Sequence, residues 1–203
     1  IGNIADGSGG GAQVAAGNAS FNGGSFARNQ TRRLGGAGAY VSGNLAVTDT
    51  YFGSNTAPGN GSWGGGASAG SAVLKTAWFE GNQSGSAGGL YVSGNLIDTG
   101  SLFLRNSATS TLGNGGGADV FGASILNATQ FGSNRAGQSG GGLFIVQPVT
   151  LTNVALRDNV AVGSGISAGG GGAYAQGSGV ISGGVVSGNT SAGDGGGVQA
   201  SVL

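Results

Sequence analysis

The sequence FGSN at residues 52–55 recurs unchanged at residues 131–134. Five related stretches place an apolar residue three positions before an asparagine: FARN, FEGN, FLRN, LRDN and VSGN. Together the copies end at Asn29, Asn55, Asn82, Asn106, Asn134, Asn159 and Asn189, at intervals of 24 to 30 residues. A motif that recurs with such a period is typical of a solenoid, in which each copy belongs to one rung.

A second motif alternates with the first. It is a glycine pair followed by a small or aliphatic residue, and it begins at Gly35, Gly65, Gly88, Gly116, Gly141, Gly171 and Gly196. Because glycine has no Cβ atom, we expect these pairs to let the backbone re-enter the stack where a side chain would clash. The variable number of residues between the two motifs predicts that loops of different length leave the stack there.

Apolar residues form columns when the repeats are aligned. The position five before each apolar residue of the FxxN motif is aliphatic in most copies, as in Val47, Leu74 and Leu126, and Asp98 is the exception, beside Ile97. Alternate residues share one face of a strand, and no stretch has the periodicity of an amphipathic helix. Residues 1–203 are therefore predicted to form one all-β domain, a right-handed parallel β-helix of about seven rungs with three short strands per rung.

The FxxN motif is predicted to form two internal stacks. Its apolar residues are expected to pile up inside the coil: Phe26, Phe52, Phe79, Phe103, Phe131, Leu156 and Val186. Its asparagines are expected to mark a corner, because asparagine tolerates the left-handed backbone conformation and its amide bonds to the same amide in the next rung.

Composition excludes several classes of partner. Only 7% of the residues are charged and the formal net charge is zero, which disfavours binding to nucleic acid or to an anionic membrane. There is no histidine, cysteine or long apolar run, so we expect no cofactor, no metal site and no membrane insertion. An extracellular or cell-surface location is expected.

The alternating FxxN and GGA[ILV] motifs resemble the repeats of the polymorphic outer-membrane protein family. The resemblance extends from Phe26 to Val198. It implies a secreted β-helix that acts as a surface adhesin, with a glycan or protein on a host or cell surface as a possible partner. The sequence thus favours a structural and adhesive protein without catalysis.

Two other functions are weaker alternatives. A carbohydrate-binding or carbohydrate-cleaving β-helix needs clustered carboxylates if it cleaves, yet the acidic residues are scattered at about one per rung. An ice-binding protein needs a regular threonine face, and the offsets of the threonines drift; the candidates are Thr48, Thr50, Thr76, Thr99, Thr129, Thr150 and Thr152.

Two surfaces are candidates for contacts. An exposed aromatic patch is expected on the outward side of the strand after the glycine pair, from Tyr40, Tyr91, Phe121, Phe144 and Tyr174. Both ends of the chain appear uncapped and end in apolar strand residues, so we expect the protein to stack end to end on itself through Ile1, Ile4, Val198, Val202 and Leu203.

Overall fold

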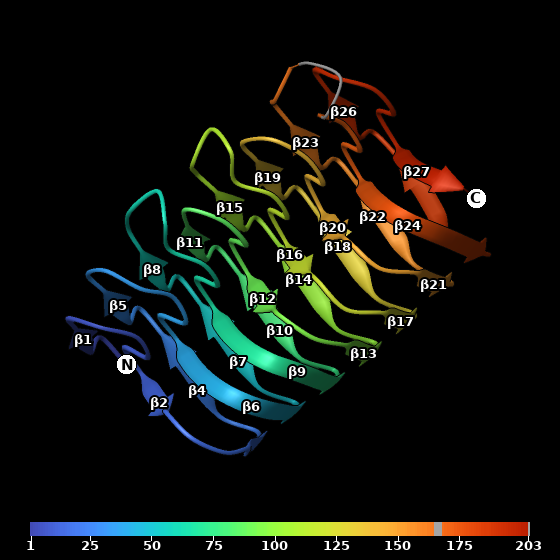
Figure 1. Cartoon of the computed structure of the whole chain (residues 1–203). Helices are drawn as coiled ribbons and strands as arrows, with labels where there is room; N and C mark the ends of the chain where they lie inside the picture. Colours follow the sequence, from blue (N-terminus) through green and yellow to red (C-terminus); the bar gives the residue numbers. More distant parts are fainter. Residues whose placement is uncertain (165–167, 203) are drawn as a thin grey trace.

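Short parallel strands stack along one axis in the computed structural model of the chain, which describes residues 1–164 and 168–202 (Figure 1). They form three sheets over about seven turns, which confirms the predicted parallel β-helix. Each rung contributes to all three sheets. No helix occurs among the described residues, and none of them forms an apolar helix long enough to cross a membrane.

The first sheet consists of two-residue strands that follow the asparagines. Its order is β1 (Ile4–Ala5), β5 (Gln30–Thr31), β8 (Thr56–Ala57), β11 (Gln83–Ser84), β15 (Ser107–Ala108), β19 (Arg135–Ala136), β23 (Val160–Ala161) and β26 (Thr190–Ser191). Its inward side chains are small.

The second sheet, called here the phenylalanine sheet, consists of the strands that precede the asparagines. Its order is β4 (Ser25–Ala27), β7 (Tyr51–Gly53), β10 (Trp78–Glu80), β14 (Leu102–Leu104), β18 (Gln130–Gly132), β22 (Ala155–Arg157) and β25 (Val185–Ser187).

The third sheet, the long sheet, follows the glycine pairs and bends in the middle. In some rungs one strand passes through the bend, as in β6 (Ala39–Thr48), β9 (Ala67–Lys75) and β24 (Ala173–Ser182). The remaining strands of this sheet are β2 (Ala12–Val14), β3 (Ala19–Asn22), β12 (Leu90–Val92), β13 (Leu96–Thr99), β16 (Ala118–Val120), β17 (Ser124–Asn127), β20 (Leu143–Ile145), β21 (Val149–Thr152) and β27 (Val198–Val202).

The phenylalanines form the predicted internal stack. Phe52, Phe79, Phe103 and Phe131 are at most 1% exposed, and successive rings lie 4.7 to 4.9 Å apart with planes within 10° of parallel. The strand spacing of about 4.8 Å imposes this face-to-face arrangement, which isolated aromatic pairs do not prefer. Leu156 continues the stack in a buried position, whereas Val186, paired with it in the last rung, is 46% exposed.

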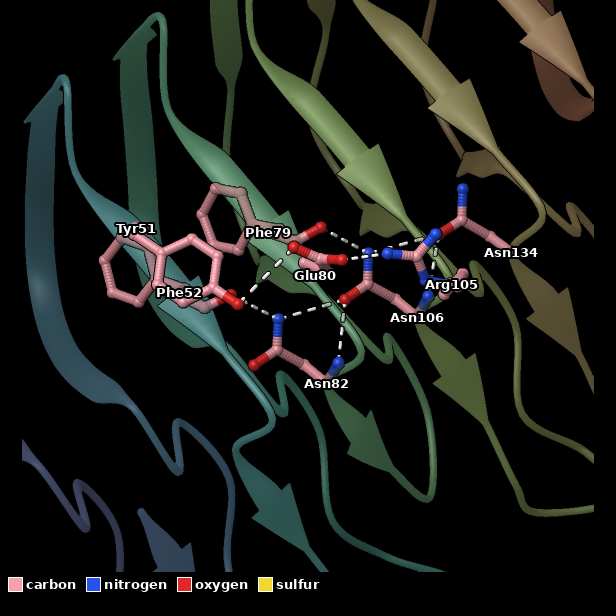
Figure 2. A network of polar contacts seen from close by, with 8 residues as sticks. All are labelled: Tyr51, Phe52, Phe79, Glu80, Asn82, Arg105, Asn106 and Asn134. Carbon is pink, nitrogen blue, oxygen red and sulfur yellow. Dashed lines mark hydrogen bonds and ion pairs between the residues drawn. The ribbon is translucent and has the colours of Figure 1, made fainter. Parts of the chain in front are cut away.

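The asparagines form a continuous ladder beside this stack (Figure 2). In its interior each amide nitrogen donates to the amide oxygen of the asparagine in the next rung, at 2.9 to 3.1 Å. That oxygen also accepts from the backbone N–H of the earlier asparagine, as Asn106 Oδ1 does from Asn82 at 3.0 Å. The second amide hydrogen goes to the carbonyl of the preceding rung's core residue, as Asn82 Nδ2 does to Phe52 at 2.8 Å. Every donor and acceptor of an interior amide is thereby paired inside a dry core.

The ladder begins one rung earlier than the FxxN motifs. Asn3 donates from its backbone and from its amide to Asn29 Oδ1, at 3.1 and 3.0 Å. The sequence IGN at residues 1–3 is the tail of such a corner, and these hydrogen bonds confirm that interpretation.

The left-handed corner residue is not the asparagine but the residue before it. Ser54 and Ser133 have φ angles of 53°, and Arg28, Arg105 and Asp158 have φ angles of 52° to 55° at the same position. The expectation that the asparagines themselves adopt this conformation is therefore wrong. The asparagine instead lies between this corner and the next strand, and its backbone N–H bonds to the ladder.

The glycine motif makes room for the ladder. An added Cβ at Gly142 would lie 3.1 Å from Asn159 Cγ, and one at Gly117 would lie 3.3 Å from Asn134 Cγ. Each of these added Cβ atoms would also lie within 2.6 Å of the carbonyl oxygen of a glycine in the next rung. The two motifs keep in phase because a glycine of one rung packs on the asparagine of the next.

Replacing Asn82 by alanine is expected to lower the free energy of unfolding by about 3 kcal/mol, because the Phe52 carbonyl and the backbone and amide N–H groups of Asn55 lose a buried partner, and Asn106 Oδ1 loses one of its two donors. Urea denaturation measures the loss. The control is Asn127→Ala, at an exposed strand position whose side chain has no hydrogen bond within the described chain, which should cost less than about 0.5 kcal/mol. Equal costs at the two sites would contradict the ladder's role.

Replacing Thr76 by glycine is expected to stabilise the protein by about 0.5 to 1 kcal/mol. Thr76 is a β-branched, exposed residue with a φ angle of 50°, and the equivalent corner of the next rung is Gly100. The variant also loses the solvent-exposed hydrogen bond that Thr76 Oγ1 donates to Asp49, and the relief of backbone strain is expected to exceed that loss. Thermal unfolding should show a higher midpoint for this variant. Thr99→Gly, in an exposed strand position, should lower the midpoint, and a fall in both would argue against strain at Thr76.

Candidate contact surface

One outward column of the long sheet contains most of the predicted aromatic patch. Strand pairing aligns Gln13, Tyr40, Ser68, Tyr91, Asp119, Phe144, Tyr174 and Gln199 in successive rungs. Phe121 lies beside the column, just after β16. The structure thus brings the five predicted residues to one side of the coil, although Asp119 divides them into two groups.

The first group is an open aromatic cluster. The ring of Tyr91 lies 5.7 Å from that of Phe121 and 5.7 Å from that of Trp63, measured between centroids. Phe121 is 44% exposed, and Trp63, Tyr40 and Tyr91 are partly exposed. Sequence reasoning missed Trp63 because it lies in a loop of variable length, outside the two motifs.

The second group is closed. Phe144 and Tyr174 stack with centroids 5.4 Å apart and planes 2° from parallel, and Phe144 is only 5% exposed. The expectation that Phe144 is an exposed contact residue is wrong, because adjacent rungs place two large rings in direct contact and each covers the other.

A hollow adjoins the open cluster at the bend of the long sheet. Its sides are Tyr40, Tyr91 and Trp63, and small residues form the rest of its lining: Val41, Ser42, Ser68, Ala69, Gly70 and Ser93. The small residues follow from the register, since Ser68 lies between Tyr40 and Tyr91 in the column and Gly70 lies at the bend. No charged side chain lines this hollow.

Asp119 is a buried carboxyl next to the cluster. It is 2% exposed, although the sequence placed it on the outward side of its strand, and Ser86 Oγ donates to its Oδ2 at 3.1 Å. Its Oδ1 has no partner within the described residues. Desolvation raises the pKa of Asp119 to about 7, and burial together with this nearby carboxylate raises the pKa of Tyr91.

Asp98 occupies the inward column between Leu74 and Leu126. It is 1% exposed, while its neighbour Ile97 is 48% exposed, so the strand keeps strict alternation and the aspartate takes the core position. Thr129 Oγ1 donates to its Oδ2 at 2.6 Å. Burial is the larger effect and raises the pKa of Asp98 to about 6, against the lowering effect of hydrogen bonds with Ser101 and Thr129.

The two raised carboxyls do not form a catalytic pair. Asp98 faces the core from β13, whereas Asp119 faces outward from β16. Within residues 1–164 and 168–202 no three acidic, histidine or cysteine side chains gather in a way that would hold a metal ion.

The outward face of the phenylalanine sheet has a small polar network (Figure 2). Glu80 forms an ion pair with Arg105 and accepts a hydrogen bond from Tyr51 Oη at 3.4 Å. Burial and the adjacent Glu80 raise the pKa of Tyr51. Because the Arg105 side chain is 63% exposed, this ion pair contributes little to stability. Its effect is to orient these side chains on the surface of the sheet.

The threonines do not form a continuous face. Thr50 and Thr129 are buried, and Thr76 lies at a left-handed corner. Thr48, Thr99 and Thr152 share an outward column that Lys75 and Asn127 interrupt. The adjacent outward column is mostly aliphatic and exposed, through Val73, Ile97, Ile125 and Val180, and Thr150 is a single threonine between Ile125 and Val180.

Comparison of the chain with protein-family models gives no match, and comparisons with curated proteins and with solved structures give none either.

The stability of the protein is expected to rise as the pH falls from about 8 to about 4. Both carboxyls have folded-state pKa values above the ordinary aspartate value of 3.8, so the folded state binds their protons more tightly. Their contribution is complete below about pH 4 and is lost as the pH rises through about 6 for Asp98 and about 7 for Asp119.

Urea titrations at several pH values measure this dependence. Asp98→Asn should reduce the difference between pH 4 and pH 8 by about 2 kcal/mol, because the shifted group is gone. Asn127→Ala, at an exposed strand position without a titratable group, should leave the difference unchanged. An unaltered pH dependence in Asp98→Asn would show that this carboxyl is not desolvated in solution.

Proposed function

We propose that the protein is a non-catalytic, extracellular structural or adhesive rod, whose terminal rungs pair either with a second copy or with further rungs of a longer adhesin. The observation that supports this proposal is the contrast between its interior and terminal rungs. Interior rungs bury their apolar columns almost completely, whereas the first and last rungs of the chain expose the equivalent residues.

The first rungs expose both side chains and strand edges. Ile1 and Ile4 are 70% and 60% exposed, and Phe21 and Phe26 are only partly buried, with centroids 4.7 Å apart. The strands β1 and β4 end their sheets, so one side of each lacks a strand partner. Such edges pair readily with another chain.

The last rungs offer a complementary surface. Ile181, Val186 and Val202 are 40%, 46% and 64% exposed, and Val198 is partly buried. The strands β25 and β26 end their sheets. Leu203, which the sequence also assigned to this contact, lies outside the described residues.

A head-to-tail contact would continue every column of the coil. The next rung would extend the asparagine ladder from Asn189 and the apolar stack from Val186, with new strand hydrogen bonds at the same spacing. The formal net charge of zero provides no long-range repulsion between copies. Because this contact is heterologous, it produces filaments and not closed dimers.

The non-catalytic and adhesive parts of the proposal have separate support. Scattered acidic residues favour a protein without hydrolytic chemistry, and the two alternating motifs favour a relation to the polymorphic outer-membrane proteins. The open aromatic cluster, midway along the rod, is the surface we assign to contact with another molecule.

Sedimentation velocity over a range of concentrations tests the end-to-end contact. The chain is expected to form species of increasing mass as concentration rises, and Val202→Lys should suppress them by placing a charge in the contact. Val73→Lys, at a similarly exposed position on the side of the rod, should not. A strict monomer at high concentration would contradict the pairing of the terminal rungs with a second copy.

A further inference from the structure

The geometry points to a binding site for a neutral sugar ring in the hollow between Tyr40, Trp63 and Tyr91. This inference concerns the side of the rod and does not depend on association of its ends. It rests on the shape, the chemistry and the absence of charge in the lining of this hollow.

The shape follows from strand register and the bend. Tyr40 and Tyr91 lie in the same column two rungs apart, a separation of about 9.6 Å between their backbones. The intervening residue is Ser68, which is too small to fill the space between two aromatic side chains. Beyond it, β6 and β9 curve at the bend (Figure 1), and the exposed Ser42 and Ser93 lie on either side of Gly70.

The aromatic sides suit the apolar faces of a pyranose ring. A sugar ring presents C–H groups on its faces and hydroxyls around its rim, so it packs on aromatic rings and bonds sideways to polar groups. Three aromatic side chains adjoin this hollow, and Trp63 is held against Tyr91 with centroids 5.7 Å apart. This contact pre-orients two of the three rings, which lowers the entropic cost of binding.

The polar groups suit the hydroxyl rim. The hydroxyls of Tyr40, Tyr91, Ser42 and Ser68 make no hydrogen bond within the described residues. Ser93 Oγ lies 3.3 Å from the Gly70 carbonyl oxygen, to which it donates. The Gly70 oxygen also accepts from the Gly94 backbone N–H at 2.6 Å and is satisfied. The lining therefore offers four unpaired hydroxyls, which serve sugar hydroxyls as donors or acceptors.

The lining also selects against charged ligands. It has no charged side chain, and the nearest carboxyl in the column, Asp119, is 2% exposed and disfavours anions. A uronic or sialic acid would gain no ion pair here. The ligand class is a neutral hexose or N-acetylhexosamine, free or within a glycan.

The neighbouring rungs show why the site occurs here. Phe144 and Tyr174 occupy the same column in adjacent rungs, stack on each other and leave no opening. Aromatic residues flanking a small one produce a hollow, whereas consecutive aromatic residues close it.

Fluorescence titration tests the site directly. The chain has two tryptophans, so Trp78→Phe leaves Trp63 as the only reporter. The probes are methyl glycosides of glucose, galactose, mannose and N-acetylglucosamine, with sialyllactose as the charged comparison and a proline-rich peptide as an alternative occupant. At least one neutral glycoside is expected to change the Trp63 emission, with a Kd of about 1 to 10 mM for a single ring.

Two variants and a control separate the site from general effects. Tyr40→Ala removes one aromatic side and Ser93→Leu fills the bend from an exposed position, and each should weaken binding by about tenfold or more. Tyr174→Ala, in the same column but outside the hollow, should bind as the parent does. Circular dichroism verifies that each variant is folded.

The inference is overturned if no neutral glycoside alters the Trp63 signal, if only the peptide binds, or if sialyllactose binds more tightly than the neutral sugars. It is also overturned if Ser93→Leu and Tyr40→Ala, both folded, bind like the parent. Filament formation is scored separately by sedimentation, so failure of either proposal is distinguishable from failure of the other.

Discussion

The fold depends on the asparagine ladder, because the ladder provides hydrogen bonds where the chain turns a corner and regular strand pairing is interrupted. Each interior amide uses both hydrogens and both oxygen lone pairs, and it satisfies backbone atoms of the preceding rung and side-chain amides of the rungs on both sides. A buried polar ladder is favourable only when it is complete, since one missing member leaves several partners unpaired in a dry core. This condition accounts for an asparagine at the corner of every rung.

The ladder in turn determines the rest of the rung. Because the ladder is buried in the coil, the backbone that packs against it must be glycine, as at Gly117 and Gly142. A side chain there would collide with the ladder or with the backbone of the next rung. Its position beside the phenylalanine stack requires a left-handed residue immediately before it, which is a strained serine or arginine in several rungs. The described residues of the loops between these two points form no hydrogen bond with the ladder amides, so the loops vary in length and supply surface residues such as Trp63.

The sequence was sufficient to predict the fold because its motifs report backbone constraints that repeat. The ladder, the phenylalanine stack and the inward columns of the long sheet all follow from positions relative to FxxN, and the strand pairing bears them out. Asp98 follows the same register although it is polar and interrupts an aliphatic column in the sequence. The alternation of the strand places its side chain inward, and the hydrogen bond from Thr129 offsets part of the cost of burying the carboxyl. The left-handed corner was misplaced by one residue because asparagine, serine and glycine all tolerate that conformation.

The contact surface was less predictable, because exposure depends on neighbours that the motifs do not specify. Phe144 is covered by Tyr174 from the next rung, and Asp119 is buried although its strand position faces outward. Trp63 belongs to a loop that no repeat describes. Periodicity therefore identifies the column in which a residue lies, whereas the sizes of the residues above and below it decide whether it is open.

Hydrogen exchange of the asparagine side-chain amides, followed by nuclear magnetic resonance, tests the ladder most directly. The account predicts that the amide protons of Asn55, Asn82, Asn106 and Asn134 exchange only when the whole coil unfolds, with the same free energy of opening as the buried strand amides around them. The exposed amide of Asn127 should exchange freely. Fast exchange at the ladder positions, in a protein whose strand amides remain protected, would contradict the claim that these side chains hold the rungs together.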